Sequence, residues 1–139
     1  MISRVLVPMD DSELSERALR FALDAHPTAE VVVLHVVGGP SSMMGEAANV
    51  ALADDPDAEA SAHARSVLER AREIAAECDR EIETDVQIGH PARTIVDAAE
   101  GFDAVVIGSH GGTLAERLIV GNVAERIVRR SPVPVTVVR

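Results

Sequence analysis

Residues 5–37 read VLVPMDDSELSERALRFALDAHPTAEVVVLHVV, and this stretch decides the fold. Its two aliphatic runs, Val5–Val7 and Val31–Val37, lack the polar alternation of a half-exposed strand, which indicates strands covered on both faces. Between them, Asp10–Ser12 can cap a helix, and apolar residues then recur every three to four positions until Pro27. Strand, helix and strand in this order predict a parallel α/β sheet.

The same alternation continues to the end of the chain. A second helix is predicted by small or apolar residues on one face, at Ala60, Ala64, Val67, Ala71, Ile74 and Cys78. A strand near Thr84–Ile88, a helix from Pro91, a strand at Ala104–Ile107, a helix after Gly121 and a strand at Val135–Val138 follow. We therefore expect one α/β domain over 1–139, with helices on both faces of an open parallel sheet and right-handed crossovers.

The expected core is aliphatic, because the chain has two Phe and neither Trp nor Tyr. The helical spacing turns Phe21 and Ala25 of the first helix inward, together with Val128 of the last. Ile2 is expected to extend the first buried strand, and Cys78 is expected to be a buried, inert thiol. Residues 38–55 show no period and predict a long loop, in which Met43 and Met44 either cover a ligand or are plain loop residues.

Charge excludes several classes of function. The 139 residues carry a formal net charge of -10, and all 13 basic residues are arginine. A nucleic-acid-binding protein would need a basic patch, and a surface-bound membrane protein a basic amphipathic helix; the sequence has neither. An acidic surface without lysine resembles that of proteins adapted to high salt.

The cysteine count and the hydropathy of the sequence limit the cellular compartments in which we expect the protein. The single cysteine excludes an internal disulfide and a cysteine-based zinc site. The first residues, Met1–Arg4, lead straight into a strand without a signal-peptide layout, and no apolar run approaches about 18 residues. We expect a cytoplasmic protein.

Glycines mark the predicted ligand site. In open α/β sheets, ligands bind beyond the carboxyl ends of the strands, where here Pro8–Asp10 follows the first strand and Gly108–Gly112 the fourth. Glycines let backbone N–H groups approach an anion, and the helix after Gly121 points its N-terminus at the same place. Asn122 and Glu125 resemble a capping box at that helix. Glycine clusters alone are weak evidence, and neither a P-loop lysine pattern nor a G-x-G-x-x-G pattern occurs here.

The spacing of Gly108, Gly111 and Gly121 resembles the G-x2-G-x9-G-[S/T] signature of the ATP-binding branch of the universal stress protein family. The opening residues 5–13, the segment Leu34–Val36, the Gly89–Ala92 helix start and the closing residues 131–135 also resemble that family. The resemblance therefore covers the whole chain. One position departs from it, because Asn122 stands where the family has Ser or Thr.

The resemblance implies a five-stranded parallel sheet of order 3-2-1-4-5, an adenine nucleotide alpha hydrolase-like fold. It implies that ATP, ADP or another adenine nucleotide binds, with Mg²⁺ or Mn²⁺, and that two copies form a homodimer through the last strands. On the family pattern, the adenine lies near Pro8, Met9, Asp10 and Val36. The ribose and phosphates lie on Gly108, His110, Gly111, Gly121, Asn122 and Val123.

Several residues allow two interpretations. Asp10 either contacts the ligand or is a turn residue before the first helix, and Arg117 either neutralises phosphate or is a solvated helix charge. His110 is expected to face the ribose or phosphate without acting as a base, because no motif places a Ser or Cys nucleophile. His35 is expected to be a core residue, and the other histidines form no metal-like cluster.

Three functions remain open at this point. The first is an ATP-binding stress or signalling protein that is not an enzyme. The second is a slow ATP hydrolase, although no general base stands out. The third is a dimerisation module without nucleotide, which the departure at Asn122 favours and the three glycines oppose.

Overall fold

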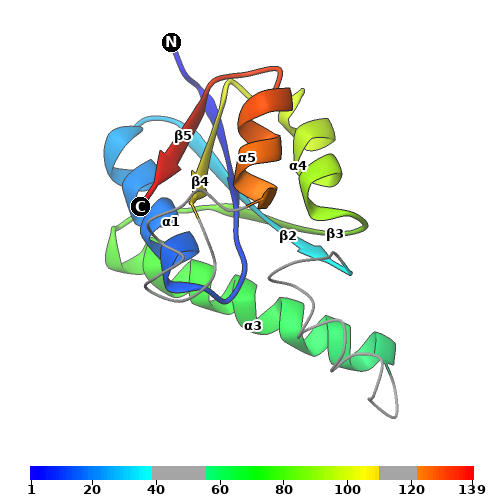
Figure 1. Ribbon diagram of the computed structural model, residues 1–139. Helices are drawn as coiled ribbons and strands as arrows, with labels where there is room; N and C mark the ends of the chain where they lie inside the picture. The colour runs from blue at the N-terminus through cyan, green and yellow to red at the C-terminus, as the bar shows by residue number, and fades with distance from the viewer. Residues whose placement is uncertain (39–55, 110–121) are drawn as a thin grey trace.

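The computed structural model describes residues 1–38, 56–109 and 122–139, with side chains described from residue 61 in the second range (Figure 1). Strands and helices alternate there as predicted. Their bounds are β1 (Arg4–Pro8), α1 (Glu13–Ala25), β2 (Glu30–Val37), α3 (Pro56–Glu77), β3 (Glu83–Ile88), α4 (Pro91–Ala99), β4 (Ala104–Gly108), α5 (Asn122–Arg130) and β5 (Val135–Val138).

The sheet is parallel and has the order β3-β2-β1-β4-β5, which confirms the expected topology. The chain moves from β1 to β2 and β3 on one side, and from β4 to β5 on the other. The direction of winding therefore reverses between β1 and β4. In such sheets the reversal point is where ligands bind, at the carboxyl ends of the strands.

Helices cover both faces of the sheet. α1 and α3 pack on one face, and α4 and α5 lie side by side on the other (Figure 1). Because side chains alternate along a strand, Val5 and Val7 of β1 pack in the core under α1 and α3, whereas Leu6 packs under α4 and α5. Both cores are almost entirely aliphatic, as the composition predicts.

Five details of the predicted core are wrong. Phe21 is 42% exposed, Val128 is 48% exposed, and Ile2, Ala25 and Cys78 are also exposed. On α1 the buried stripe consists of adjacent pairs, Leu14, Ser15, Ala18, Leu19, Ala22 and Leu23, which leaves Phe21 and Ala25 off the contact face.

Cys78 is exposed because α3 ends at Glu77. The next residues form a Schellman turn: Asp79 has φ +54°, the Asp79 N–H donates to Ala76 O at 3.1 Å, and the Arg80 N–H donates to Ala75 O at 2.9 Å. The chain therefore leaves the helix axis at Cys78, and the periodicity that holds up to Ile74 no longer applies.

The edge of the sheet where the strands begin is here called the amino edge. There, side chains form hydrogen bonds with backbone groups at the ends of neighbouring segments. The Arg80 guanidinium donates to the carbonyl oxygens of Leu23, His26 and Ala29 at 2.6, 3.2 and 2.8 Å, around the end of α1. Asp103 Oδ2 accepts from the N–H groups of residues 3 and 4 and from the Ser3 hydroxyl, at 2.8 to 2.9 Å. These groups are occupied within the chain.

Candidate functional site at the carboxyl edge of the sheet

β1 and β4 part toward the edge where the strands end, here called the carboxyl edge. Their pairing covers Val5 with Ala104 and Leu6 with Val105, although the strands continue to Pro8 and Gly108. By contrast, β1 stays paired with β2 up to Pro8. The backbones of β1 and β4 are thus not tied to each other at the point where the direction of winding reverses.

The turn after β1 is held by side chains. Asp10 Oδ1 accepts from the Ser12 N–H at 2.8 Å, and the Ser12 hydroxyl accepts from the Ser15 N–H at 3.2 Å, which caps α1. The buried Ser15 hydroxyl is 3.1 Å from Asp10 O and 2.9 Å from Ser12 O. Asp10 Oδ1 therefore stabilises the turn before α1, which is the second of the two roles predicted for Asp10.

His35 fixes the backbone that leaves β1. Its ring is fully buried, and Nδ1 lies 2.9 Å from Met9 O, while the Met9 N–H donates to Leu34 O at 2.9 Å. The His63 ring from α3 lies 5.7 Å from the His35 ring, centre to centre. The prediction that His35 is a core residue is confirmed, and its hydrogen bond also positions a segment of the candidate site.

Two of the predicted adenine contacts lie on opposite faces of the sheet. Met9 is 4% exposed and packs in the core under α1 and α3, whereas Val36, also 4% exposed, packs under α4 and α5. Pro8 is buried between them at the end of β1. The structure therefore brings these backbones to one edge but does not bring the side chains of Met9 and Val36 together.

The end of β4 is tightly packed on one side. A Cβ added at Gly108 would lie 2.9 Å from the backbone carbon and oxygen of Leu14, so the first turn of α1 sits directly against this glycine. The next residue continues the sheet pairing, because the Ser109 N–H donates to Val138 O at 2.8 Å. Gly108 is thus required by packing, whatever ligand binds beside it.

Ser109 was not predicted as a site residue. It is 1% exposed, and its hydroxyl has no hydrogen-bond partner among the residues that the structure describes. A buried hydroxyl without a partner is energetically unfavourable, so such a group in a native structure calls for an explanation. A signal was present in the sequence, since Ser109 directly follows a glycine at the end of a buried strand.

The helix predicted after Gly121 is α5, which is described from Asn122 onward. Asn122 is its first residue and is exposed, and the half-buried Val123 packs against the core under α4 and α5. Glu125 pairs with Arg129, with Oε1 and Nη2 3.0 Å apart, and no described contact links it to Asn122 as the predicted capping box requires.

A model described as "Universal stress protein family" matches residues 1–139. The chain belongs to the universal stress protein family. This universal stress protein is 32% identical over 148 residues to Universal stress protein YxiE of Bacillus subtilis, with 100% of each chain covered.

Solved structures agree with this assignment. Universal stress protein UspA from Lactobacillus plantarum has a TM-score of 0.75 at 25% identity, over 99% of this chain and 98% of that one. A universal stress protein in complex with cAMP has a TM-score of 0.71 at 29% identity, over 99% of this chain and 97% of that one. The fold and the family are therefore established.

The rest of the predicted site lies outside the described residues of this universal stress protein. His110, Gly111 and Gly121 fall there, as do Met43, Met44 and Arg117. Within the described ranges, no group of three or more His, Cys, Asp or Glu side chains gathers as metal ligands would. The helices described there lack the combination of length and hydropathy that a membrane span requires.

Proposed function

We propose that this universal stress protein binds an adenine nucleotide, ATP with Mg²⁺ or Mn²⁺, at the carboxyl edge between β1 and β4. The observation that carries the proposal is the early end of the β1–β4 pairing at the reversal point, beside the buried hydroxyl of Ser109. A neighbour of the same fold, 29% identical, is in complex with cAMP, which supports an adenine nucleotide.

The proposed contacts fall into two groups. The turn after β1 and the end of β2 take the adenine and ribose through Asp10 and through the backbones of Pro8, Met9 and Val36, because the side chains of Met9 and Val36 are buried on opposite faces. Backbone N–H groups of the glycine loop and the first turn of α5 take the ribose and phosphates, through Gly108, His110, Gly111, Gly121, Asn122 and Val123. Because the chain carries a net charge of -10, a divalent cation on the phosphates would lower the electrostatic cost of binding.

Two copies are proposed to pair through β5. This strand stands at the edge of the sheet with β4 as its neighbour, so its other side has no strand partner among the described residues. The nucleotide would then bias the conformation or the pairing of a cytoplasmic stress or signalling dimer. Light scattering checks the pairing: twice the chain mass supports it, and a monomer at high concentration contradicts it.

The first experiment identifies the ligand. The protein is purified natively, in molar salt if it needs it, then denatured, and any released nucleotide is identified by chromatography and mass spectrometry. ATP, ADP and cAMP are also titrated separately, each with and without Mg²⁺. Co-purified ATP, or tight binding of Mg-ATP, supports the proposal and shows that Asn122 is tolerated. An empty protein that also fails to bind each added nucleotide contradicts it.

A variant pair locates the binding. Gly111→Val blocks the backbone approach in the glycine loop and is expected to abolish nucleotide binding. Gly101→Val adds the same side chain at the amino edge, where an added Cβ would have ordinary contacts of 3.8 and 3.9 Å, and is expected to leave affinity unchanged. Unchanged affinity in Gly111→Val would overturn the assignment. Steady ATP turnover would indicate a hydrolase instead of a nucleotide-responsive protein.

A further inference from the structure

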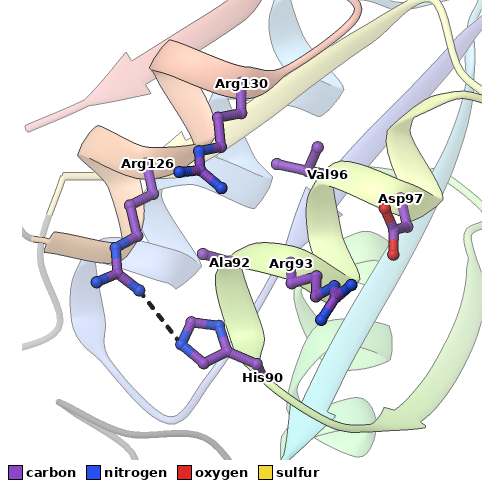
Figure 2. A pocket seen from close by; sticks show the side chains of 7 residues that line it. All are labelled: His90, Ala92, Arg93, Val96, Asp97, Arg126 and Arg130. Atoms are coloured by element: carbon purple, nitrogen blue, oxygen red, sulfur yellow. Dashed lines mark hydrogen bonds between the residues drawn. The ribbon is translucent and has the colours of Figure 1, made fainter.

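A second candidate site lies between the helices α4 and α5. A cleft of about 440 Å³ opens there, and Figure 2 shows Arg126 and Arg130 projecting into it from α5. His90, Arg93 and Asp97 line it from the α4 side, over the apolar side chains of Ala92 and Val96. The guanidinium groups of Arg126 and Arg130 lie on the α5 side of this partly apolar floor, whereas that of Arg93 lies toward Asp97 (Figure 2).

The three arginines of the cleft differ from the four described arginines that pair with a glutamate. Arg4, Arg20, Arg70 and Arg129 each form an ion pair with a glutamate at 2.7 to 3.0 Å. Within the described residues, no carboxylate lies within 4.0 Å of the guanidinium groups of Arg93, Arg126 and Arg130. The carboxylate of Asp97, which also lines the cleft, pairs with none of them. One cleft of a chain with a net charge of -10 is thus lined by three arginines that lack a carboxylate partner among the described residues.

His90 holds one of these cations in place. Arg126 Nη1 lies 3.3 Å from His90 Nε2, and because a guanidinium can only donate, Nε2 accepts (Figure 2). This contact ties Arg126 of α5 to the residue that precedes α4. It places the guanidinium beside the first turn of α4, and its other N–H groups have no hydrogen-bond partner among the described residues.

The N-terminus of α4 adds to the positive potential. Pro91 is its first residue, the side chain of His90 does not cap the helix, and the first turn contains no acidic residue. The N–H groups of Ala92 and Arg93 belong to that first turn, where backbone donors lack partners within the helix. An anion in the cleft therefore meets guanidinium donors and the positive end of a helix dipole.

We propose that this cleft binds the phosphate group of a small organic phosphate, with the organic part resting on Ala92 and Val96. Arg126 and Arg130 donate to the phosphate oxygens from α5, and Arg93 adds positive charge from α4. The cleft volume suits a ligand of this size. The inference goes beyond the nucleotide site, because none of the residues proposed for that site lines the cleft.

The test uses two probes, phenyl phosphate and inorganic phosphate, titrated at low ionic strength to limit screening. Binding is measured by calorimetry and by NMR shifts of the Ala92 and Arg93 amides. Saturable binding with phenyl phosphate tighter than inorganic phosphate is expected. The double variant Arg126→Gln/Arg130→Gln is expected to weaken phenyl phosphate binding by about tenfold or more.

The control removes the same charge elsewhere. Arg17 and Arg129 are exposed and do not line the cleft, so Arg17→Gln/Arg129→Gln is expected to change affinity by no more than about twofold. Equal weakening in both double variants would overturn the proposal, as would binding without saturable shifts at the two amides. So would loss of phenyl phosphate binding in Gly111→Val together with its retention in Arg126→Gln/Arg130→Gln. Cleft binding that survives Gly111→Val supports the proposal, whatever the fate of the nucleotide site.

Discussion

The two edges of the sheet use polar groups differently. At the amino edge, Arg80 and Asp103 each satisfy three partners within the chain. At the carboxyl edge, β1 and β4 part early, and the Ser109 hydroxyl is buried without a partner in the described residues. The amino edge thus stabilises the fold, and the carboxyl edge is the one at which we propose that the ligand binds.

The direction of the helices explains this division. In a parallel α/β sheet each helix runs opposite to the strands, so helix C-termini meet the amino edge and helix N-termini meet the carboxyl edge. The free carbonyl groups at the amino edge need donors, which Arg80 supplies to the end of α1. At the carboxyl edge, Ser12 caps α1, whereas no side chain caps α4, and an uncapped helix N-terminus suits an anion.

The largest expected effect is at the amino edge. Arg80→Ala leaves the carbonyl groups of Leu23, His26 and Ala29 without their charged donor and is expected to lower the free energy of unfolding by about 2–4 kcal/mol. Urea unfolding measures this, and nucleotide affinity of the folded variant should not change. Arg65→Ala, at an exposed arginine of α3, is the control and should stay within about 0.5 kcal/mol of the parent. A loss as small as the control's would show that Arg80 is not a stabilising cap.

A second substitution disturbs the carboxyl edge. Gly108→Ala places a Cβ 2.9 Å from the Leu14 backbone, and the shift of α1 is expected to cost about 1–3 kcal/mol and to weaken nucleotide binding. Gly101→Ala has ordinary contacts and is expected to be neutral or slightly stabilising. Thermal unfolding and calorimetric titration compare the two. Equal stability of both variants would contradict the tight packing of Gly108 on α1.

Replacing either of two buried serines by alanine is expected to change stability in opposite directions. Ser15→Ala removes a hydroxyl that lies within hydrogen-bond distance of Asp10 O and Ser12 O and is expected to destabilise by about 1 kcal/mol. Ser109→Ala removes a hydroxyl without a described partner, so the nucleotide-free protein should be unchanged or up to about 1 kcal/mol more stable. Nucleotide affinity should fall in Ser109→Ala. A destabilised Ser109→Ala with normal affinity would assign Ser109 a structural role.

The smallest expected effect depends on pH. Hydrogen bonds from the Ser3 hydroxyl and from the N–H groups of Ser3 and Arg4 hold the pKa of Asp103 below its ordinary value of 3.8. The folded-state pKa is lowered, so this contribution to stability is fully present above pH 3.8 and is lost as pH falls through the folded-state value. Asp103→Asn should therefore reduce stability at neutral pH and flatten its decline in acid. Asp24→Asn, at an exposed residue of α1, is the control in unfolding curves across pH, and an equal flattening there would remove Asp103 as the cause.

Much of this fold was predictable because its signals are local. Aliphatic runs such as Val31–Val37 need only their own composition to indicate buried strands, and the Ser12 cap lies within three residues of the N–H it binds. The errors were at positions such as Phe21, where helical spacing permits burial but packing favours Leu19 and Leu23. Periodicity gives the direction of a helix face only to within a residue or two.

The candidate site was predicted unevenly for the same reason. Glycine spacing and strand ends marked Gly108 and Asp10 from the sequence, but that Gly108 packs on Leu14 depends on a contact between residues 94 positions apart. The position of Ser109 after a glycine at a strand end was visible in the sequence, but whether its hydroxyl finds a partner depends on the packed fold, so Ser109 was missed. The cleft between α4 and α5 was missed because its arginines come from two helices.

The sequence by itself determined the order of strands and helices, the aliphatic core, the acidic charge and the family, because each depends on neighbouring residues or on composition. The tertiary structure alone decided where β1 and β4 part, which polar groups stay unpaired and which arginines converge. The physical reason is that pairing, burial and electrostatic potential at a point depend on groups distant in the chain, which only the packed fold brings together.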